Sequence, residues 1–477
     1  MLHTVGMLNH NRRQKSSFKI APALWAASLL AGCGGESTTP PDPGFANHSC
    51  NEIETECVQI AGGDTQALLD ATNALEPGTT LILGAGTFAL ENGITIRNAD
   101  GTHLIGQGID QTTLDFGPAT AQVNGVDVIG DDFLIQDLTV LDSPKDGVRV
   151  EASKGVVFRR IRTTWTNAAD KTNGAYGIYP VKSSDVLVED SRAENASDAG
   201  LYVGQSRNVI VRNNVITGNV AGLEIENTQY ADVYGNLAEN NTAGIVVFDL
   251  PGNPIIGHDV RLRDNTIRNN NLANFSPGGT VSMIPAGTGT FAMASRRVEI
   301  TGNVYENNQT GDIALISGLV VDSDPSVWEL TEAEIVGDWQ GLGLMPGAAP
   351  SSIMNFRTEN VVVAGNSHTN SGTHPDTSRD LGLLLAILYG SHPIDAVIYD
   401  AIGESSIDAT DIAKNSNDNH ICIGGNSDGS FAILDLGTQM GAPGSPFLKN
   451  ATAPLAHFSC TELTGGPVAA VSLASAN

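Results

Sequence analysis

The sequence predicts an all-β fold, a single-stranded right-handed parallel β-helix with an N-terminal capping helix and a disulfide-bearing C-terminal cap. Three observations lead to this prediction: a glycine that recurs every 22 or 23 residues, short β-branched runs after it, and an asparagine pair in phase with it. Each short strand would leave both hydrogen-bonding edges open. Stacking successive units about 4.8 Å apart pairs every edge and encloses a continuous aliphatic core.

The repeat is clearest between residues 177 and 249. A spacing of 22 residues separates Gly200, Gly222 and Gly244, and Gly177 precedes them by 23. The asparagine pairs follow the pattern Asn-x4-Asn, at Asn214/Asn219, Asn236/Asn241, Asn265/Asn270 and Asn303/Asn308. Asparagine tolerates left-handed turns and can hydrogen-bond to its copies along a stack. A TIM barrel and a leucine-rich repeat are excluded, because no strand is followed by a long amphipathic helix and the Leu-x-x-Leu-x-Leu pattern is missing.

Both ends of such a stack need caps. We expect a short N-terminal helix with Asp64 as its N-cap and Ala67, Leu68, Ala71 and Leu75 on one face. The first strand and turn follow at residues 80–88. Coils with their N-terminal cap are expected over residues 50–370 and an irregular capping region over residues 371–477. Three segments break the period and are expected to fold as loops over the flank, at 251–259, 275–291 and 321–350.

The charge excludes one class of partner. Among 477 residues, 53 Asp and Glu stand against 25 Lys and Arg, which gives a net charge of −28. A polyanion of this size repels phosphate backbones, so nucleic acid is not an expected partner. The 53 glycines and 5% aromatic residues fit a folded chain with many turns.

The N-terminus predicts a lipoprotein signal peptide over residues 1–32. Basic residues precede an apolar run at 20–30, which is too short to span a bilayer. The run ends in Leu30-Ala-Gly-Cys33, which resembles the lipobox of bacterial lipoproteins. This resemblance implies cleavage before Cys33, lipidation of its sulfur, a tether over residues 33–49 and a membrane anchor in the bacterial cell envelope. Gly34 is not the Asp that retains such proteins at the inner membrane, so the outer membrane is expected.

Four other cysteines remain in this exported chain, Cys50, Cys57, Cys422 and Cys460. An even number suggests two disulfides, for which three connectivities exist. We favour the local pairs Cys50–Cys57 and Cys422–Cys460, and a zinc site built from the four thiols is the alternative. No Cys-x-x-Cys occurs, so haem attachment and a redox motif lack support.

A family resemblance lies in the tracts from Gly78 to Phe88 and from Leu104 to Gly108. They resemble the first coils of pectate-lyase-like β-helix proteins, and the asparagine-rich repeats resemble those of alginate C5-epimerases and of the periplasmic maturation factor for nitrous oxide reductase. The lipobox, these tracts and the late cysteine pair together resemble a group of bacterial β-helix lipoproteins without settled activity. The resemblance covers about residues 60–370 and implies the fold. The Asp-Pro-His-Asp motif of the epimerases is absent, so their activity is not carried over.

The candidate site lies on the outer face of the coils. In β-helix carbohydrate enzymes several coils deliver side chains to one groove, and strand alternation directs every second residue outward. Counting from the repeat glycines places seven side chains on neighbouring coils, within about 10–15 Å: Arg149, Tyr179, Lys182, Tyr202, Gln205, Glu224 and Glu226.

Two kinds of chemistry fit these residue types. Lyase or epimerase action on a uronate needs a base, for which Lys182 or Tyr202 are candidates, a cation such as Arg149 to neutralise the carboxylate, and Tyr179 as the acid. A glycoside hydrolase would instead use Glu224 and Glu226 as paired carboxylates. The competing reading is a non-catalytic lipoprotein that binds glycan or an envelope protein along the same face.

Acidic loop residues before the repeat glycines suggest one cofactor. Asp146, Asp170 and Asp198 recur at this phase, and stacked carboxylates could hold Ca²⁺. Such a cation would reconcile an acidic protein with an acidic polysaccharide as its partner, although solvated turn residues are the simpler interpretation. The chain is expected to be a monomer.

Overall fold

The computed structural model describes residues 47–476 apart from 98–99, 254, 332–351, 391–392, 409–410, 428, 435–447 and 451–455. The expected signal peptide and Cys33, as well as the tether up to residue 46, lie outside these residues. Residues 42–477 form one compact unit. Within the described part of the chain, no helix has the length and apolar character needed to cross a membrane.

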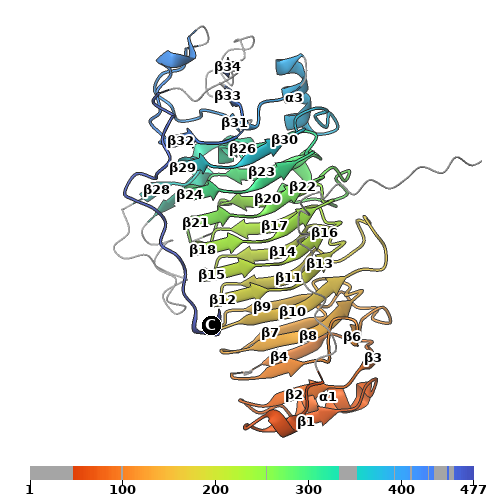
Figure 1. Cartoon of the computed structure of the whole chain (residues 1–477). Helices are drawn as coiled ribbons and strands as arrows, with labels where there is room; N and C mark the ends of the chain where they lie inside the picture. Colours follow the sequence, from red (N-terminus) through yellow and green to blue (C-terminus); the bar gives the residue numbers. More distant parts are fainter. Residues whose placement is uncertain are drawn as a thin grey trace, which may run out of the picture. The chain divides into compact units, whose positions relative to one another are not determined.

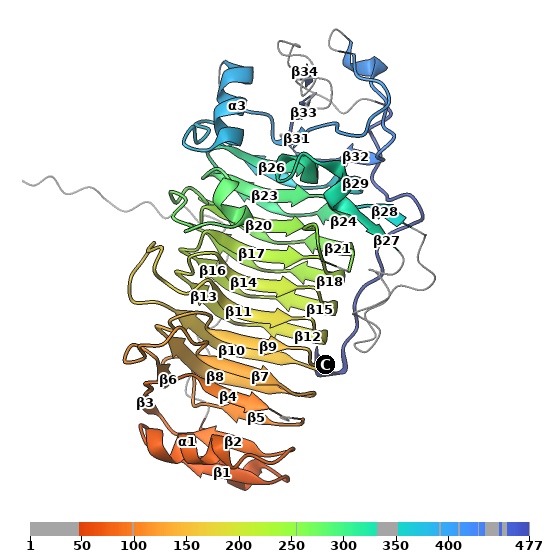
Figure 2. The same cartoon turned by 180° about the vertical axis from the view of Figure 1, so that it is seen from behind.

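Stacked parallel strands confirm the predicted β-helix (Figures 1 and 2). One sheet of 12 strands, called sheet B here, forms one face of the coils. Its strands follow each other in chain order: β4 (Ile94–Arg97), β7 (Val126–Ile129), β9 (Val148–Glu151), β11 (Tyr176–Val181), β14 (Ala199–Gly204), β17 (Ala221–Glu226), β20 (Ala243–Phe248), β23 (Thr288–Met293), β26 (Gly311–Ile316), β31 (Val397–Tyr399), β33 (Phe431–Ile433) and β34 (Leu448–Asn450).

The remaining faces belong to sheet A, which has 20 strands. Its strands are β1 (Cys57–Ile60), β2 (Thr80–Leu83), β3 (Gly86–Ala89), β5 (His103–Ile105), β6 (Thr112–Asp115), β8 (Leu134–Leu141), β10 (Val157–Thr164), β12 (Ser184–Glu189), β13 (Arg192–Glu194), β15 (Arg207–Arg212), β16 (Val215–Thr217), β18 (Gln229–Tyr234), β19 (Leu237–Glu239), β21 (His258–Arg263), β22 (Thr266–Arg268), β24 (Arg296–Thr301), β25 (Val304–Glu306), β29 (Glu359–Ala364), β30 (Ser367–Thr369) and β32 (Ile421–Gly424). A separate antiparallel pair joins β27 (Glu329–Thr331) to β28 (Ser352–Met354).

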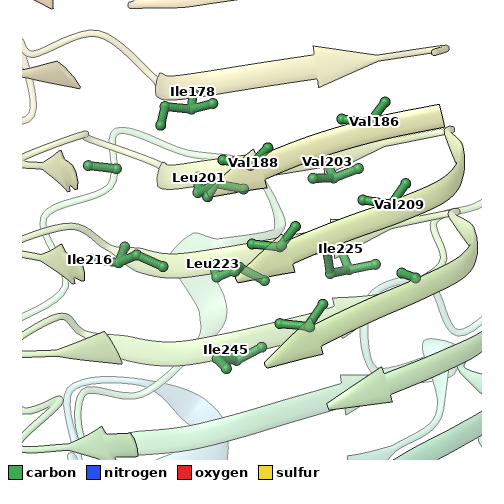
Figure 3. Packing of buried hydrophobic residues seen from close by; sticks show 14 of the residues in the cluster. Ile178, Val186, Val188, Leu201, Val203, Val209, Ile216, Leu223, Ile225 and Ile245 are labelled. Atoms are coloured by element: carbon green, nitrogen blue, oxygen red, sulfur yellow. The ribbon is translucent and has the colours of Figure 1, made fainter. Parts of the chain in front are cut away.

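The interior is a set of aliphatic columns in the predicted register. Leu201 pairs with Leu223, which pairs with Ile245, and all three are fully buried. Figure 3 shows these side chains stacked inside the coils beside the next inward column, which contains Val203 and Ile225. The 22-residue spacing therefore places each aliphatic side chain directly on its copy.

Two asparagine ladders run along the stack, as the Asn-x4-Asn pattern predicts. In one ladder the Asn219 amide donates to Asn241 Oδ1 at 3.0 Å, and the Asn241 amide donates to Asn270 Oδ1 at 3.1 Å. The other ladder runs from Asn214 to Asn426. The left-handed turn falls one residue earlier than expected, for example at Asn240 with φ 57°. The ladder asparagines themselves serve only as hydrogen-bonding groups.

The N-terminal cap is α1 (Thr65–Asn73), in agreement with the sequence. Asp64 Oδ1 accepts a hydrogen bond from the Ala67 amide at 3.0 Å, and Leu68 is fully buried. Leu75 lies beyond the helix end and still packs against the core. Both local disulfides, Cys50–Cys57 and Cys422–Cys460, are present, which removes the zinc alternative.

The C-terminal region differs from the expected boundary at residue 370. Parallel pairing continues through β31, β32 and β33, so coils extend into the segment expected to be irregular. The same region contributes α3 (Asp380–Tyr389). Period counting missed these coils because long insertions separate their strands.

The last residues form a strap along sheet A, defined as residues 460–476. It begins at Cys460, which is bonded to Cys422 on β32. Arg297 on β24 then donates to the Thr464 carbonyl, and Arg159 on β10 donates to the Ser475 carbonyl. The strap is the dark blue trace that ends near β12 in Figures 1 and 2.

Candidate active site

Strand register brings four of the predicted residues into one column on the outer face of sheet B. Arg149 on β9 pairs with Tyr179 on β11. Tyr202 on β14 pairs with Glu224 on β17, and the pairing of Ile178 with Leu201 sets Tyr179 opposite Tyr202. Glu226 follows Glu224 on the same strand and, by alternation, on the same face.

The central residues of this column point outward from the coils, as strand alternation predicts, but they are not exposed to solvent. Tyr202 is 4% exposed, Glu224 2% and Val246 0%. Tyr202 and Val246 belong to a second apolar cluster outside the solenoid, to which Val281, Ile284 and Trp328 contribute from the loops after β22 and β26. These loops have no copy in the repeat, so counting along the strands could not reveal that they cover the sheet.

Three tyrosines form a compact group at the side of this cluster nearest the N-terminal coils. The ring centroids of Tyr176, Tyr179 and Tyr202 lie 4.6–4.9 Å apart. Tyr176 and Tyr179 remain half-buried, so part of each ring faces solvent. Tyr176 was not predicted, because it precedes the repeat glycine Gly177 whereas the outward count began after it.

Carboxyl groups gather beside these rings. Burial, reinforced by Glu226 and Asp146, raises the pKa of Asp198 to about 7. Complete burial and the charges of Asp198 and Glu226 raise the pKa of Glu224 well above its usual range. Burial also raises the pKa of Asp146 to about 6. Each of these acids therefore holds a proton more readily than an exposed carboxyl at the same pH.

Glu226 differs from its neighbours in its hydrogen bonds. Its Oε1 accepts from Asn253 at 3.0 Å and from Gln205 at 3.4 Å, and the Tyr202 hydroxyl also bonds to this carboxylate. Burial raises the pKa of Glu226, but the three donors act in the opposite direction and favour the ionised form. Asn253 comes from the loop between β20 and β21, a segment that carries no periodic signal.

Gly204 makes the Tyr202–Glu226 contact possible. It pairs with Glu226 in the ladder, and a Cβ at this position would lie 2.3 Å from the Tyr202 ring. The absence of a side chain lets the ring lie over the strand and direct its hydroxyl to the next coil.

The basic residues are engaged elsewhere. Arg149 donates to both oxygens of Asp127, at 2.9 and 3.1 Å, and lies 3.4 Å from Glu151. Lys182 Nζ lies 3.9 Å from the same Glu151. Burial raises the pKa of Tyr202 far above its usual range, so the phenol keeps its proton. Because Arg149 is already paired with carboxylates, it is poorly suited to neutralise a uronate. Because Tyr202 keeps its proton, it is poorly suited to act as a base.

The structure separates the three aspartates considered for Ca²⁺. Asp146 and Asp198 influence each other electrostatically. Asp170 is instead occupied within its own turn, where it accepts from the amide and hydroxyl of Thr172. In the described part of the chain, no group of three or more His, Cys, Asp or Glu side chains is arranged to hold a metal ion.

Comparison with known proteins identifies the fold class. The model of the right-handed β-helix region family matches residues 92–259 and 172–324. No curated protein sequence matches the chain.

Several solved structures are similar in fold. The A-module of a mannuronan C-5 epimerase from Azotobacter vinelandii is 15% identical, with 77% of this chain and 90% of that chain covered and a TM-score of 0.44. An α-1,3-glucanase from Streptomyces thermodiastaticus is 16% identical, with coverages of 83% and 57% and a TM-score of 0.44. An alginate lyase from a Paenibacillus species is 14% identical, with coverages of 54% and 90% and a TM-score of 0.30. The family model spans residues 92–324, and with the stacked parallel strands of sheets A and B it identifies the fold as a right-handed parallel β-helix.

Proposed function

We propose that the chain acts on a polysaccharide and cleaves it by glycoside hydrolysis at the outer face of β14 and β17. The observation that supports this most is the carboxyl group of Asp198, half-buried with a pKa raised to about 7, next to the hydrogen-bonded Glu226. Glycoside hydrolysis needs one carboxylic acid that is still protonated near neutral pH and one ionised carboxylate.

The roles follow from the contacts of each group. Asp198 is the general acid, because its pKa keeps a large protonated fraction at neutral pH. Glu226 is the ionised partner, as base or nucleophile, since three donors stabilise its charge. Glu224 is a positioning residue: it is buried, and the charges of Asp198 and Glu226 raise its pKa, so that it stays protonated beside them. The half-exposed rings of Tyr176 and Tyr179 offer an apolar platform for a sugar ring.

Uronate β-elimination or C5-epimerisation is the second candidate for the same face. It is supported by the adjacency of Arg149, Tyr179 and Tyr202. The ion pairs of Arg149 and the net charge of −28 favour hydrolysis over this reaction. Glycan binding without turnover would use the same tyrosines.

A screen of neutral and acidic polysaccharides tests the proposal. We expect new reducing ends without the ultraviolet absorbance of an unsaturated uronate. Asp198→Asn and Glu226→Gln should each lower the rate by about 100-fold or more, because each removes a proton-transfer group. The control Glu239→Gln changes a carboxylate paired with Arg268 outside the site and should retain activity. Unsaturated products would favour β-elimination, and binding without any cleavage would favour the non-catalytic alternative.

We also propose that the protein is exported and anchored in the cell envelope, in the outer membrane where one exists. The support is the basic n-region, the apolar run and the sequence Leu30-Ala-Gly-Cys33. Cys33→Ser should release the protein in soluble form and abolish palmitate labelling. Labelling that persists in this variant would contradict the anchor.

A further inference from the structure

An apolar pocket lies on the outer face of sheet B, beyond the carboxyl groups. Its cavity, of about 400 Å³, is lined by Phe291 on β23 and by four further apolar side chains, those of Met283, Val320, Leu381 and Leu384. Met283 and Val320 are each 37% exposed, so the pocket is open to solvent. Protein sites for small molecules have volumes of about 300–1,000 Å³ and mostly apolar walls. The size and the lining of this pocket therefore fit a ligand.

Hydrogen bonds hold the two walls of the pocket together. One wall is the loop with the short 3-10 helix Thr280–Met283, and the other is the start of α3. Arg379 Nη2 donates to the Asn274 carbonyl at 3.0 Å, and the Ala286 amide donates to Asp376 Oδ2 at 3.0 Å. The pocket is thus preformed, so that a ligand does not have to order these segments when it binds.

The pocket adjoins the proposed general acid. A Cβ on Gly279 would lie 3.7 Å from Asp198 Oδ2. Ser282 lines the pocket, and its amide and hydroxyl both donate to the Gly279 carbonyl, at 3.2 and 2.6 Å. One turn of chain therefore separates Asp198 from the pocket wall. In the register of sheet B, Phe291 is two strands from Glu224, which is about 10 Å at the usual strand spacing.

This position determines which part of a substrate meets the pocket. A general acid protonates the oxygen of the leaving group, so the part of the substrate that is released lies on the side of Asp198. The rings of Tyr176 and Tyr179 lie on β11, before β14 in the stack, whereas the pocket lies on β23, after β17. The sugar platform and the apolar pocket thus flank the carboxyl groups, and one substrate can contact both.

We propose that the pocket binds an aliphatic acyl chain carried by the leaving part of the substrate, which makes the substrate an acylated glycan. The inference rests on the proposed function, because it takes Asp198 as the general acid. The five apolar side chains of the lining carry no charge, and its two charged residues, Arg379 and Asp380, have opposite signs. The lining therefore favours a neutral chain over an ion. The flexible Met283 side chain adapts to such a chain.

Titration with n-octyl β-D-glucoside below its micelle concentration tests the inference. The full chain carries ¹³C in its methionine methyl groups, and the readout is the Met283 resonance, assigned by its loss in Met283→Leu. We expect the octyl glucoside to shift this resonance saturably. Methyl β-D-glucoside should bind at least about 10-fold more weakly, because it has no chain to bury.

Variants of the pocket wall show where the chain binds. Val320→Asp should weaken octyl glucoside binding at least about 10-fold, because a charge on the wall opposes an apolar ligand. Leu384→Gln makes the other wall polar, and it replaces Val320→Asp if that variant does not fold. The matched control is Ile387→Asp, which changes a 67% exposed position of α3 outside the lining and should bind normally. Equal losses in the control and the wall variants would overturn the inference.

Two further ligands for the pocket are distinguished by the same readout. 1-Octanol should bind at least about 10-fold more weakly than octyl glucoside, and equal affinity would mean a free chain instead of one borne by a sugar. A dimer in sedimentation that Val320→Asp dissociates would assign the pocket to a second copy of the chain. Either result would overturn the inference.

The inference and the proposed function can fail separately. Glu226→Gln should bind octyl glucoside normally, since Glu226 does not line the pocket. A Met283 shift in a protein that cleaves no polysaccharide would support the chain pocket and contradict the proposed function alone. Cleavage of a polysaccharide without any Met283 shift by octyl glucoside would overturn the inference alone.

Discussion

The carboxyl groups of the site make folding stability depend on pH. The pKa of Asp198 rises from its ordinary 3.8 to about 7 in the folded chain, chiefly because of burial. A raised folded pKa means that the protonated acid favours folding. The contribution is complete below about pH 4 and is lost as the pH rises through 7.

We therefore predict that Asp198→Asn gains stability relative to the native chain as the pH rises from 5 to 8, because asparagine carries no charge to bury. Urea unfolding at both pH values measures this difference. Asp170→Asn is the control, since hydrogen bonds from Thr172 lower rather than raise the pKa of Asp170. A difference for Asp198→Asn that stays constant with pH would contradict the prediction.

A second prediction concerns the aliphatic column. Leu223→Ala should lower the free energy of unfolding by about 2–5 kcal/mol, because it removes buried methyl groups and leaves a cavity between Leu201 and Ile245. Val304→Ala, at a position 36% exposed, should stay within about 0.5 kcal/mol. Denaturant unfolding that ranked the two in the opposite order would be incompatible with the register.

At the scale of the element, the stability lost when a ladder asparagine is replaced depends on where that asparagine lies in the ladder. Asn236 is 1% exposed; its amide donates to Asn265 and its oxygen accepts from Asn214. Asn426 ends the same ladder, is only half-buried and accepts from Asn366. An interior ladder asparagine thus bonds to ladder asparagines in both neighbouring coils, whereas a terminal one bonds to a ladder asparagine in only one.

We predict that Asn236→Ala destabilises the chain by about 2–4 kcal/mol, because the buried backbone N–H and side-chain amide of Asn214 lose their shared acceptor and the Val211 carbonyl loses a donor. Asn426→Ala should cost about half as much or less, since solvent can replace the lost bonds. Thermal and urea unfolding of the two variants give the comparison. Equal losses would mean that neighbouring amides do not depend on one another.

The periodicity predicted the positions of residues that recur from coil to coil and missed residues in segments that occur only once. Leu201, Leu223 and Ile245 have equivalent surroundings, so one count placed all three. The loops that pack on Tyr202 and Val246 occur once each, so no periodic signal indicates which face they cover. Asn253 lies in another loop without a copy, whereas Tyr176 lies on a repeated strand but precedes the glycine at which the outward count began.

At the scale of the whole unit, the strap covers apolar surface on sheet A. Leu473 packs against Val157, Leu187 and Ile210, which come from β10, β12 and β15. Val468 packs against Val362 and Cys422, from β29 and β32. The strap thus contacts coils that are far apart in the stack.

Deletion of residues 467–477 should lower the free energy of unfolding by about 3 kcal/mol or more, because Val468 and Leu473 each lose their burial. Binding of a hydrophobic dye should increase as Leu187 and Ile210 become exposed. Ser475→Ala is the control, since Arg159 contacts only the backbone carbonyl of Ser475. Unchanged unfolding after the deletion would show that the strap stabilises nothing.

The strap also constrains the order in which the chain assembles and opens. In a simple stack each coil meets only its neighbours, so coils can fray one at a time from an end. The docking surface for residues 464–475 exists only after strands from β10 to β24 have stacked. This segment therefore closes last during folding. Before coils can open from β32, the strap must dissociate from β12. We therefore expect amides at the end and in the middle of the solenoid to exchange through a single opening event.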